Sequence, residues 1–370
     1  MFTLALMFAG LRSYGQDPNY IPATECTPAL PLGDCADDDE LHPLPGKTYT
    51  YTIGVTPAVG SNTTDPGYVQ WFVYDATTYG DAIIDAGVLT TDIEPNDGSS
   101  KFLLSAETAK YNSITNEDVS IDISWHPFDA FTNEILLVAY VMGEDGCADN
   151  IEVWRIEPAF SFTLDIAGLM PDGSLPASGN ANECVSPVQD ATYDGVNLTM
   201  DYGENYVFFT VTAANFVHSW KPTFAVTSTG TSVELADVSW AYPDEAIKAD
   251  ANGVANGTWN AHDAPVIAQG GDAVGAEGEC IIVRVYLDHG NVENDVASAV
   301  TLTVDGVMYD VSAATGAEYD NTALLSDLDP NDAGDCIVGS NDSATYDLTP
   351  RPNITEVKPT TADGPFEPKN

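Results

Sequence analysis

Basic residues are scarce in this sequence. Its 370 residues contain 11 lysines and arginines against 57 aspartates and glutamates, which gives a formal charge of −46 at pH 7. Binding of nucleic acid requires clustered cations that displace counterions, and an anionic membrane surface would repel such a chain. We therefore expect neither nucleic acid nor a membrane as a partner. Repulsion between the carboxylates predicts that assembly needs salt or divalent cations.

Catalytic motifs are also missing from the sequence. It contains no nucleophile elbow, HExxH motif, P-loop, GxGxxG fingerprint or pair of zinc ligands. His126 and His218 each lie close to a tryptophan, which favours a packing role for both. Carboxylate pairs are too frequent in so acidic a chain to indicate a glycosidase, which needs two at a defined separation. We expect that the protein is not an enzyme.

Long apolar runs are absent as well. The run over residues 2–11 is much shorter than a membrane span, and no later run approaches that length. A short apolar run followed by small and polar residues is typical of a secretory signal, here residues 1–16. This signal predicts export to the extracellular surface, where cysteines usually form disulfides.

The six cysteines indicate both disulfides and repetition. Similar short motifs end at Cys26, Cys184 and Cys336, at intervals of about 150 residues. Six cysteines allow many pairings, and the sequence leaves the connectivity open. Pairing between neighbours along the chain favours Cys26–Cys35, Cys147–Cys184 and Cys280–Cys336.

Most of the chain has the pattern of β-strands. Apolar runs at residues 135–141 and 151–156 flank a glycine and aspartate turn, which predicts a hairpin within residues 133–158. A similar pattern predicts a second hairpin over residues 280–305, and a similar strand precedes each hairpin. The sequence therefore predicts an all-β fold built of tandem immunoglobulin-like β-sandwiches.

The order of these strands predicts how the chain is divided. Prolines exclude a central strand from residues 17–45, and a stretch rich in glycine, proline and serine begins at residue 168. We expect the strand at 159–166 to close the first sandwich, and short helical turns at 81–88 and 105–111. The predicted organisation is a signal peptide (1–16), a leading segment (17–45), a first sandwich (46–167), a linker (168–189), a second sandwich (190–326), and an acidic loop, orphan strand and tail (327–370).

Three segments of the chain resemble known proteins. They read CVSPVQDATYD (184–194), DYGENYVFFTVTAANF (201–216) and DNIEVWRIEPAFSFTLDI (149–166). These segments resemble the repeats of large secreted surface proteins of Bacteroidota, to which immunoglobulin-like folds are assigned. The resemblance covers most of residues 45–350. It implies export and a role at the cell surface or in a matrix, and it implies no functional residue.

One acidic cluster has the spacing of a calcium loop. Oxygen-bearing side chains alternate there as calcium ligands do, although the glycine falls later than in an EF-hand loop and no glutamate closes the site. A second candidate combines Asp34 with residues 37–40. A solvated acidic turn is the alternative for both clusters. The candidate ligands of the first cluster are Asp327, Asp329, Asn331, Asp332 and Asp335.

Aromatic side chains predict a different kind of site. A long loop at residues 246–278 interrupts the second module, and such insertions often carry binding sites. Trp259 in this loop and Tyr242 beside it are candidate glycan contacts, because exposed aromatic rings stack on sugars. Ser343 lies in a short sequence that resembles the O-glycosylation acceptor of Bacteroidota.

The C-terminal region begins a third copy of the module. Ala344, Tyr346 and Leu348 alternate with polar residues, as in a half-buried strand. One hypothesis is that residues 343–349 complete the first sandwich of a neighbouring molecule, because an open sheet edge is a template for another strand. Such a head-to-tail contact would build a filament. The alternative is that the strand folds back onto its own second sandwich.

Together these patterns predict an extracellular structural subunit of a surface or matrix assembly. Self-association and a calcium cofactor belong to that prediction. The alternative is a glycan-binding adhesin module that uses the loop at residues 246–278.

Overall fold

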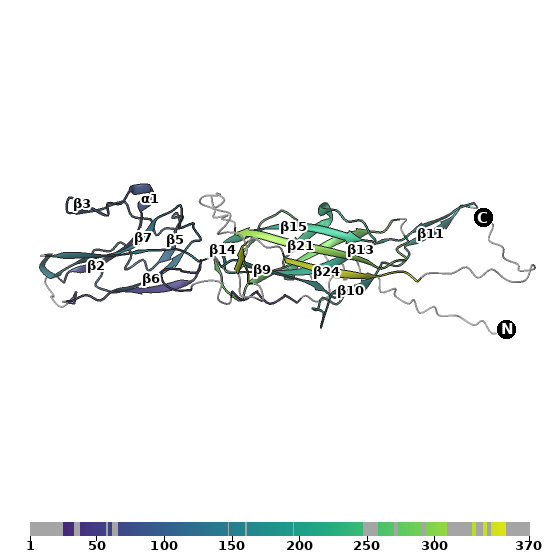
Figure 1. The fold of residues 1–370 in the computed structure, drawn as a ribbon, viewed down its shortest axis with the longest axis horizontal. Helices are drawn as coiled ribbons and strands as arrows, with labels where there is room; N and C mark the ends of the chain where they lie inside the picture. Colours follow the sequence, from purple (N-terminus) through teal and green to yellow (C-terminus); the bar gives the residue numbers. More distant parts are fainter. Residues whose placement is uncertain are drawn as a thin grey trace, which may run out of the picture.

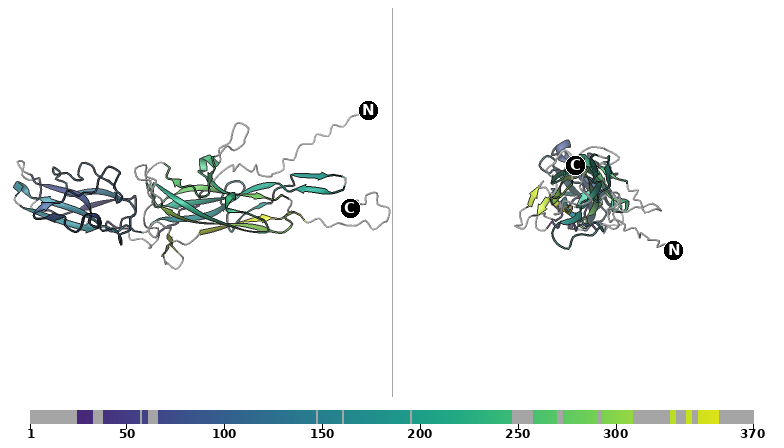
Figure 2. Two further views of the ribbon diagram at one scale, coloured as in Figure 1. Left: turned by 90° about the horizontal axis from the view of Figure 1, so that it is seen from above. Right: turned by 90° about the vertical axis from the view of Figure 1, so that its right-hand side faces the viewer.

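The computed structural model of the chain consists almost entirely of β-strands, arranged in two sandwiches that lie end to end (Figures 1 and 2). The predicted all-β class with tandem immunoglobulin-like sandwiches is confirmed. For residues 328–330 and 336–338 the structure describes the backbone only. The described residues are 25–32, 38–56, 58–60, 66–146, 148–159, 161–194, 196–246, 258–269, 273–290, 293–308, 328–330, 336–338 and 342–352.

The first sandwich packs two three-stranded antiparallel sheets against each other. One sheet has the order β2-β7-β8 and the other has the order β1-β6-β5. The hairpin predicted within residues 133–158 is confirmed as β7 and β8, in which Leu137 lies opposite Trp154. The strands are β1 (Thr48–Thr52), β2 (Tyr68–Asp75), β5 (Leu103–Ala106), β6 (Ser120–Trp125), β7 (Ile135–Met142) and β8 (Asp149–Arg155).

Of the two helical turns predicted for the first sandwich, the one at 81–88 does not form. A small hairpin of β3 (Ile84–Asp85) and β4 (Val88–Leu89) replaces the turn at 81–88. Ala86 and Gly87 join its strands with φ angles of +49° and +82°, the combination that a tight hairpin turn requires. Residues 105–111 contain the end of β5 and then a single helical turn, in which the Tyr111 N–H donates to the Glu107 carbonyl (2.9 Å). The helix α1 (Ala76–Tyr79) also forms, after the side chain of Asp75 accepts a hydrogen bond from the Thr78 N–H.

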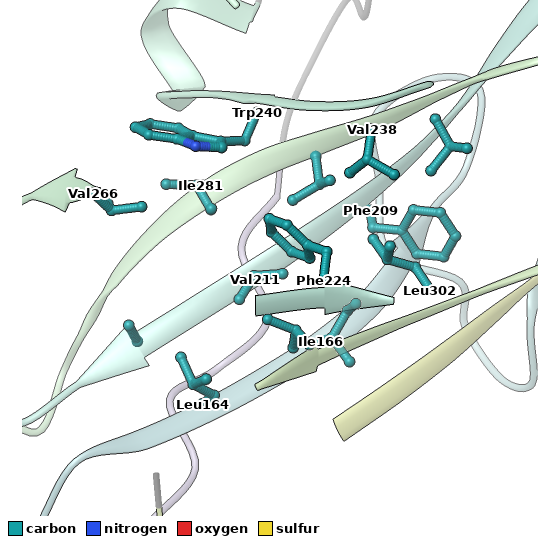
Figure 3. Packing of buried hydrophobic residues seen from close by; sticks show 14 of the residues in the cluster. Leu164, Ile166, Phe209, Val211, Phe224, Val238, Trp240, Val266, Ile281 and Leu302 are labelled. Carbon is teal, nitrogen blue, oxygen red and sulfur yellow. The ribbon is translucent and has the colours of Figure 1, made fainter. Parts of the chain in front are cut away.

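The second sandwich is larger and packs two five-stranded sheets. Their orders are β17-β16-β20-β13-β9 and β10-β24-β21-β15-β18. Apolar side chains from both sheets, including Val211, Phe224 and Trp240, fill the space between them (Figure 3). The strands are β9 (Thr163–Leu169), β10 (Ala181–Cys184), β13 (Glu204–Ala214), β15 (Ser219–Thr229), β16 (Val238–Ala241), β17 (Asn260–Ala261), β18 (Val266–Ile267), β20 (Glu279–Asp288), β21 (Ser298–Met308) and β24 (Asp342–Thr349).

Smaller elements surround these sheets. The hairpin of β11 (Asp190–Tyr193) and β12 (Leu198–Asp201) projects from the end of the second sandwich (Figures 1 and 2). The others are the β14 (Phe216–Val217) and β19 (Ala273–Val274) pair, the β22 (Leu328–Pro330) and β23 (Cys336–Val338) pair, the helix α2 (Pro243–Ala246), and single 3-10 turns at Glu144–Gly146 and Leu235–Asp237.

The second predicted hairpin, over residues 280–305, is wrong. β20 pairs with β13 and β16, whereas β21 pairs with β15 and β24 in the opposite sheet. Both strands have the expected apolar pattern, and burial alternates strictly along β21. A period of two determines which face of a strand is buried, and it does not determine the partner strand. The chain therefore crosses between the two sheets where the sequence predicts a turn.

The first sandwich is an insertion within the second. Residues 25–32 already lie on the second sandwich, where the Thr27 hydroxyl donates to Asp165 Oδ2 (2.6 Å) and the Thr212 hydroxyl donates to the Thr27 carbonyl (2.7 Å). The chain then forms the first sandwich and returns through β9, which pairs with β13. The strand predicted at 159–166 therefore does not close the first sandwich. The segment predicted as a linker contains β10 of the second.

The C-terminal strand β24 folds onto its own second sandwich, so the hypothesis of strand donation is wrong and its alternative is confirmed. β24 lies between β21, which is antiparallel to it, and β10, which is parallel. The predicted alternation is correct, because Tyr346 and Leu348 are buried while Ser343 is exposed. Tyr346 packs edge-on against Phe209 of the opposite sheet, with 6.0 Å between ring centroids.

Replacing the buried ring of β24 tests this arrangement. We expect Tyr346→Ala to lower the free energy of unfolding by about 3–5 kcal/mol, because it removes a large side chain from a packed core. Denaturant unfolding measures the change, and Ser343→Ala on the exposed face of the same strand should change it by less than about 0.5 kcal/mol. An effect of Tyr346→Ala that varies with protein concentration would contradict a strand supplied by the same molecule.

Candidate functional site

Trp259, predicted to contact glycans, covers a partly buried cation on the second sandwich. The Arg284 guanidinium lies 4.1 Å from the centroid of the Trp259 ring and 4.6 Å from that of Tyr206. Its Nε donates to the Ser239 hydroxyl (2.8 Å). Burial lowers the pKa of Arg284, and contact with the two aromatic rings favours its charged form. The Trp259 ring thus has a structural role that the sequence did not indicate.

Tyr242 also has internal partners. Its hydroxyl accepts a hydrogen bond from the Ile267 N–H (3.1 Å) and donates one to the Ile267 carbonyl (3.0 Å). Its ring packs edge-on against Trp240, with 5.3 Å between centroids. Residues 247–257 and 270–272 of the predicted binding loop lie outside the described residues. A glycan contact at Trp259 or Tyr242 stays a prediction.

Most of the predicted calcium loop lies outside the described residues. This holds for Asp327, Asn331, Asp332 and Asp335, whereas Asp329 lies in β22 opposite Ile337 of β23, with only its backbone described. Among the described side chains, no group of three or more histidines, cysteines, aspartates and glutamates is placed to hold a metal ion. Calcium binding at the loop therefore stays a prediction.

The second acidic candidate has other partners where it is described. Asp38 accepts hydrogen bonds from Lys47 Nζ (2.5 Å) and the Tyr49 hydroxyl (2.6 Å). Burial acts to raise the pKa of Asp38, but these bonds outweigh it and the pKa is lowered. The backbone N–H groups of His42 and Leu41 donate to Asp39 and lower its pKa. These carboxylates stabilise the start of the first sandwich, and Asp34 and Asp37 lie outside the described residues.

Calcium removal tests the predicted loop. We expect calcium to raise the melting temperature, and we expect Asp329→Ala to abolish most of that rise because it removes one carboxylate ligand. Differential scanning calorimetry with calcium or with a chelator measures both. Asp92→Ala, which removes an exposed carboxylate from the first sandwich, is the control and should keep the full response. Identical melting curves with calcium and chelator would show a solvated acidic turn.

The disulfide of the described chain joins Cys26 to Cys280, with 5.9 Å between their Cα atoms. The pairs Cys26–Cys35 and Cys280–Cys336 are therefore wrong. Cys184 is exposed and unpaired in β10, so Cys147–Cys184 is wrong as well. Sequence proximity predicts the wrong pairs because the leading segment packs against β20. This strand follows the inserted first sandwich in the sequence. Cys35 and Cys147 lie outside the described residues, and only the backbone of Cys336 is described.

An acidic cleft of about 890 Å³ at the end of the second sandwich was not predicted from the sequence. Glu183 and Cys184 of β10 line it, and Glu204 and Asp288 opposite them are direct cross-strand neighbours. The Tyr346 hydroxyl donates a long hydrogen bond (3.5 Å) to Glu183, and burial raises the pKa of Glu183 to about 7. The burial of Glu183 could not be predicted, because no sequence pattern distinguishes it from the many exposed carboxylates of this chain.

Glu183 gives the fold a specific pH dependence. Because its pKa is higher in the folded state than the ordinary value of 4.5, the folded state binds the proton more tightly, and stability falls as pH rises from about 4.5 through about 7. We expect Glu183→Gln to remove this part of the dependence and to stabilise the protein at pH 8 by an amount on the order of 2 kcal/mol. Denaturant unfolding at pH 5 and pH 8 measures it. Glu134→Gln, at an exposed site, is the control, and equal pH dependence in both variants would contradict the assignment.

The junction between the sandwiches is tightly connected. The chain entering the first sandwich and the chain leaving it are hydrogen-bonded to each other, from the Glu157 N–H to the Leu41 carbonyl (2.8 Å) and from the Ala159 N–H to the Pro43 carbonyl (3.2 Å). Gly46 has a φ of +81°, and a Cβ at this position would lie 2.6 Å from the Ala273 Cβ of the second sandwich. Only a glycine fits there without displacing a neighbour.

His126 and His218 meet at this junction. Their ring centroids are 5.5 Å apart, and the rings come from different sandwiches. His126 is buried, and His218 is partly buried with a φ of +61°. The packing role predicted for each ring agrees with this position. Their contact was not predictable, because the two residues lie far apart in the sequence.

Comparison with known proteins assigns no family. No protein-family model and no curated protein matches the chain. Among solved structures, it is similar to the full-length major pilin RrgB of Streptococcus pneumoniae, at a TM-score of 0.20 and 12% identity over 80% of this chain and 56% of the pilin. The chain thus spans little more than half of that pilin.

A second similar structure is the MSCRAMM ACE of Enterococcus faecalis, which binds its ligands by the collagen hug model. The TM-score is 0.19 and the identity 8%, over 87% of this chain and 97% of ACE. Similarities of this size do not assign a function, and the resemblance to Bacteroidota surface repeats stays a prediction. Among the described residues, no helix has the length and apolar character needed to span a membrane.

Proposed function

We propose that the chain is an extracellular structural subunit of a surface or matrix assembly. The observation that supports this proposal most strongly is the insertion of the first sandwich into the second, because two hydrogen-bonded segments cross the junction. Domains joined by a single linker move relative to each other by default. Two crossing segments and a packed junction oppose bending and rotation. The unit is thus suited to act as a stiff spacer.

The other parts of the proposal follow from the chemistry of the chain. The apolar N-terminal run and the Cys26–Cys280 disulfide support export, since disulfides persist in oxidising compartments. An elongated unit with two different ends can associate head to tail, and salt or divalent cations would screen the charge of −46. We propose no enzymatic activity for the chain, and neither nucleic acid nor a membrane as its partner.

Electron microscopy of native surface material tests the proposal, with antibody labelling of the chain. We expect the label on regular fibres or layers. Purified chain should appear as a two-lobed particle with a constant angle between the lobes, because the junction is rigid. Recovery of the chain only as dispersed monomers at physiological salt would overturn the structural role.

Two glycine variants test the junction in the same images. Gly46 and Gly80 have similar φ angles, +81° and +84°, but a Cβ at Gly80 meets no atom within 4 Å. Gly46→Ala should broaden the distribution of inter-lobe angles. Gly80→Ala also places an alanine at a positive φ, but it displaces no neighbour and should leave the distribution unchanged. Equal distributions for the two variants would contradict the contribution of the packed junction.

A second candidate function is a glycan-binding adhesive module. The rings predicted for that role, Trp259 and Tyr242, have internal partners. A different feature favours this function, namely a groove in the first sandwich that contains Trp154.

A further inference from the structure

A groove of about 630 Å³ opens on the side of the first sandwich where the edge strands β1 and β8 face each other. Residues 52–56, at the end of β1 and just after it, form one wall. β8 and the turn before it form the other. β1 begins next to the junction, at Thr48, and extends away from it. The groove therefore lies toward the end of the molecule that is remote from the second sandwich (Figure 1).

Three side chains of β8 form a row along this groove. Asn150, Glu152 and Trp154 alternate along the strand, so they lie on one face of it. Their partners on β7 include Leu137 and Ala139, which are fully buried, so the row continues the face of the sheet that carries these two residues. Because β8 is an edge strand, the groove occupies the place where a further strand would cover these residues. Asn150 and Glu152 are exposed, so their polar atoms are accessible to a ligand from solution.

Trp154 is held in a fixed orientation. Its ring stacks on Trp71, with 5.9 Å between centroids and an angle of 10° between planes. Trp71 is completely buried, while Trp154 is only partly buried and lines the groove. One face of the indole is thus occupied by the core, and the ring forms a rigid platform at one end of the row.

The polar members of the row are suited to hydroxyl groups. Within the described residues, the Glu152 carboxylate has no hydrogen-bond or ion-pair partner, and the Asn150 amide lies beside it on the same face. Thr52 and Thr56 line the opposite wall. The described residues that line the groove include no lysine, arginine or histidine, so the groove disfavours anionic ligands. An apolar peptide would bury the Glu152 carboxylate without a partner, which is costly.

We propose that this groove binds a neutral oligosaccharide. The apolar face of one sugar ring stacks on Trp154, and hydroxyls of the neighbouring sugars bond to Glu152 and Asn150. The row spans about 13 Å, from the rise of about 3.3 Å per residue in a strand, which suits a short chain of sugars. This inference deepens the second candidate function, and it does not depend on the structural role proposed for the chain.

Binding to defined sugars tests the proposal. The purified full-length chain is titrated in a calorimeter with neutral hexasaccharides of glucose, galactose, mannose and xylose, and with a heparin-derived hexasaccharide as the anionic probe. We expect saturable binding of at least one neutral probe and none of the anionic probe. Glu152→Ala and Trp154→Phe should weaken that binding, by roughly tenfold for Glu152→Ala, which should also keep the melting temperature because its side chain is exposed. Glu134→Ala, which removes an exposed carboxylate at the opposite end of β7, is the matched control and should bind as the unmodified chain does.

The proposal would be overturned if no neutral probe showed saturable binding, or if Glu152→Ala bound with the same affinity as the unmodified chain. It would also be overturned if the groove selected peptides from a displayed library and Trp154→Phe abolished that selection. The measurement uses dispersed protein in solution. It therefore fails or succeeds independently of whether the chain assembles on a surface.

Discussion

The Cys26–Cys280 disulfide and the hydrogen bonds beside it fix the start of the chain on the second sandwich. Everything between this point and β9 must leave that sandwich and return to it, so the first sandwich is tied at both of its ends. The two crossing segments are bonded to each other at the junction. Relative motion of the sandwiches would break these bonds together, which makes this long-range connection the main constraint on the shape of the molecule.

The second sandwich depends on strands from distant parts of the chain. β9 enters it after the insertion, and β24 enters it from the C-terminal region to lie between β10 and β21. Tyr346 of β24 and Phe209 of β13 pack across the core, so the last strand contributes to the same cluster as the central ones. Pairing over such separations closes large loops, which slows folding relative to local pairing.

Most charged side chains lie outside the hydrophobic core. Several carboxylates near folded elements accept hydrogen bonds from local donors, as Asp39 does from the backbone of residues 41 and 42. Arg284 is a partly buried cation that contacts two aromatic rings. Glu183 and the cross-strand neighbours Glu204 and Asp288 concentrate negative charge at one end of the molecule. That end is therefore a poor surface for an anionic partner.

The sequence by itself determined where most strands lie and which of their faces are buried. Alternation at Ala344, Tyr346 and Leu348 and the apolar runs of β7 and β8 gave correct strands, because a period of two is a local property of the chain. Only the tertiary structure decided which strands pair and which cysteines meet. β20 and β21 have similar patterns yet belong to different sheets, and Cys26 finds Cys280 rather than Cys35. The contacts of Trp259 with Arg284 and of Trp154 with Trp71 could not be predicted for the same reason, because they form only when distant segments pack together.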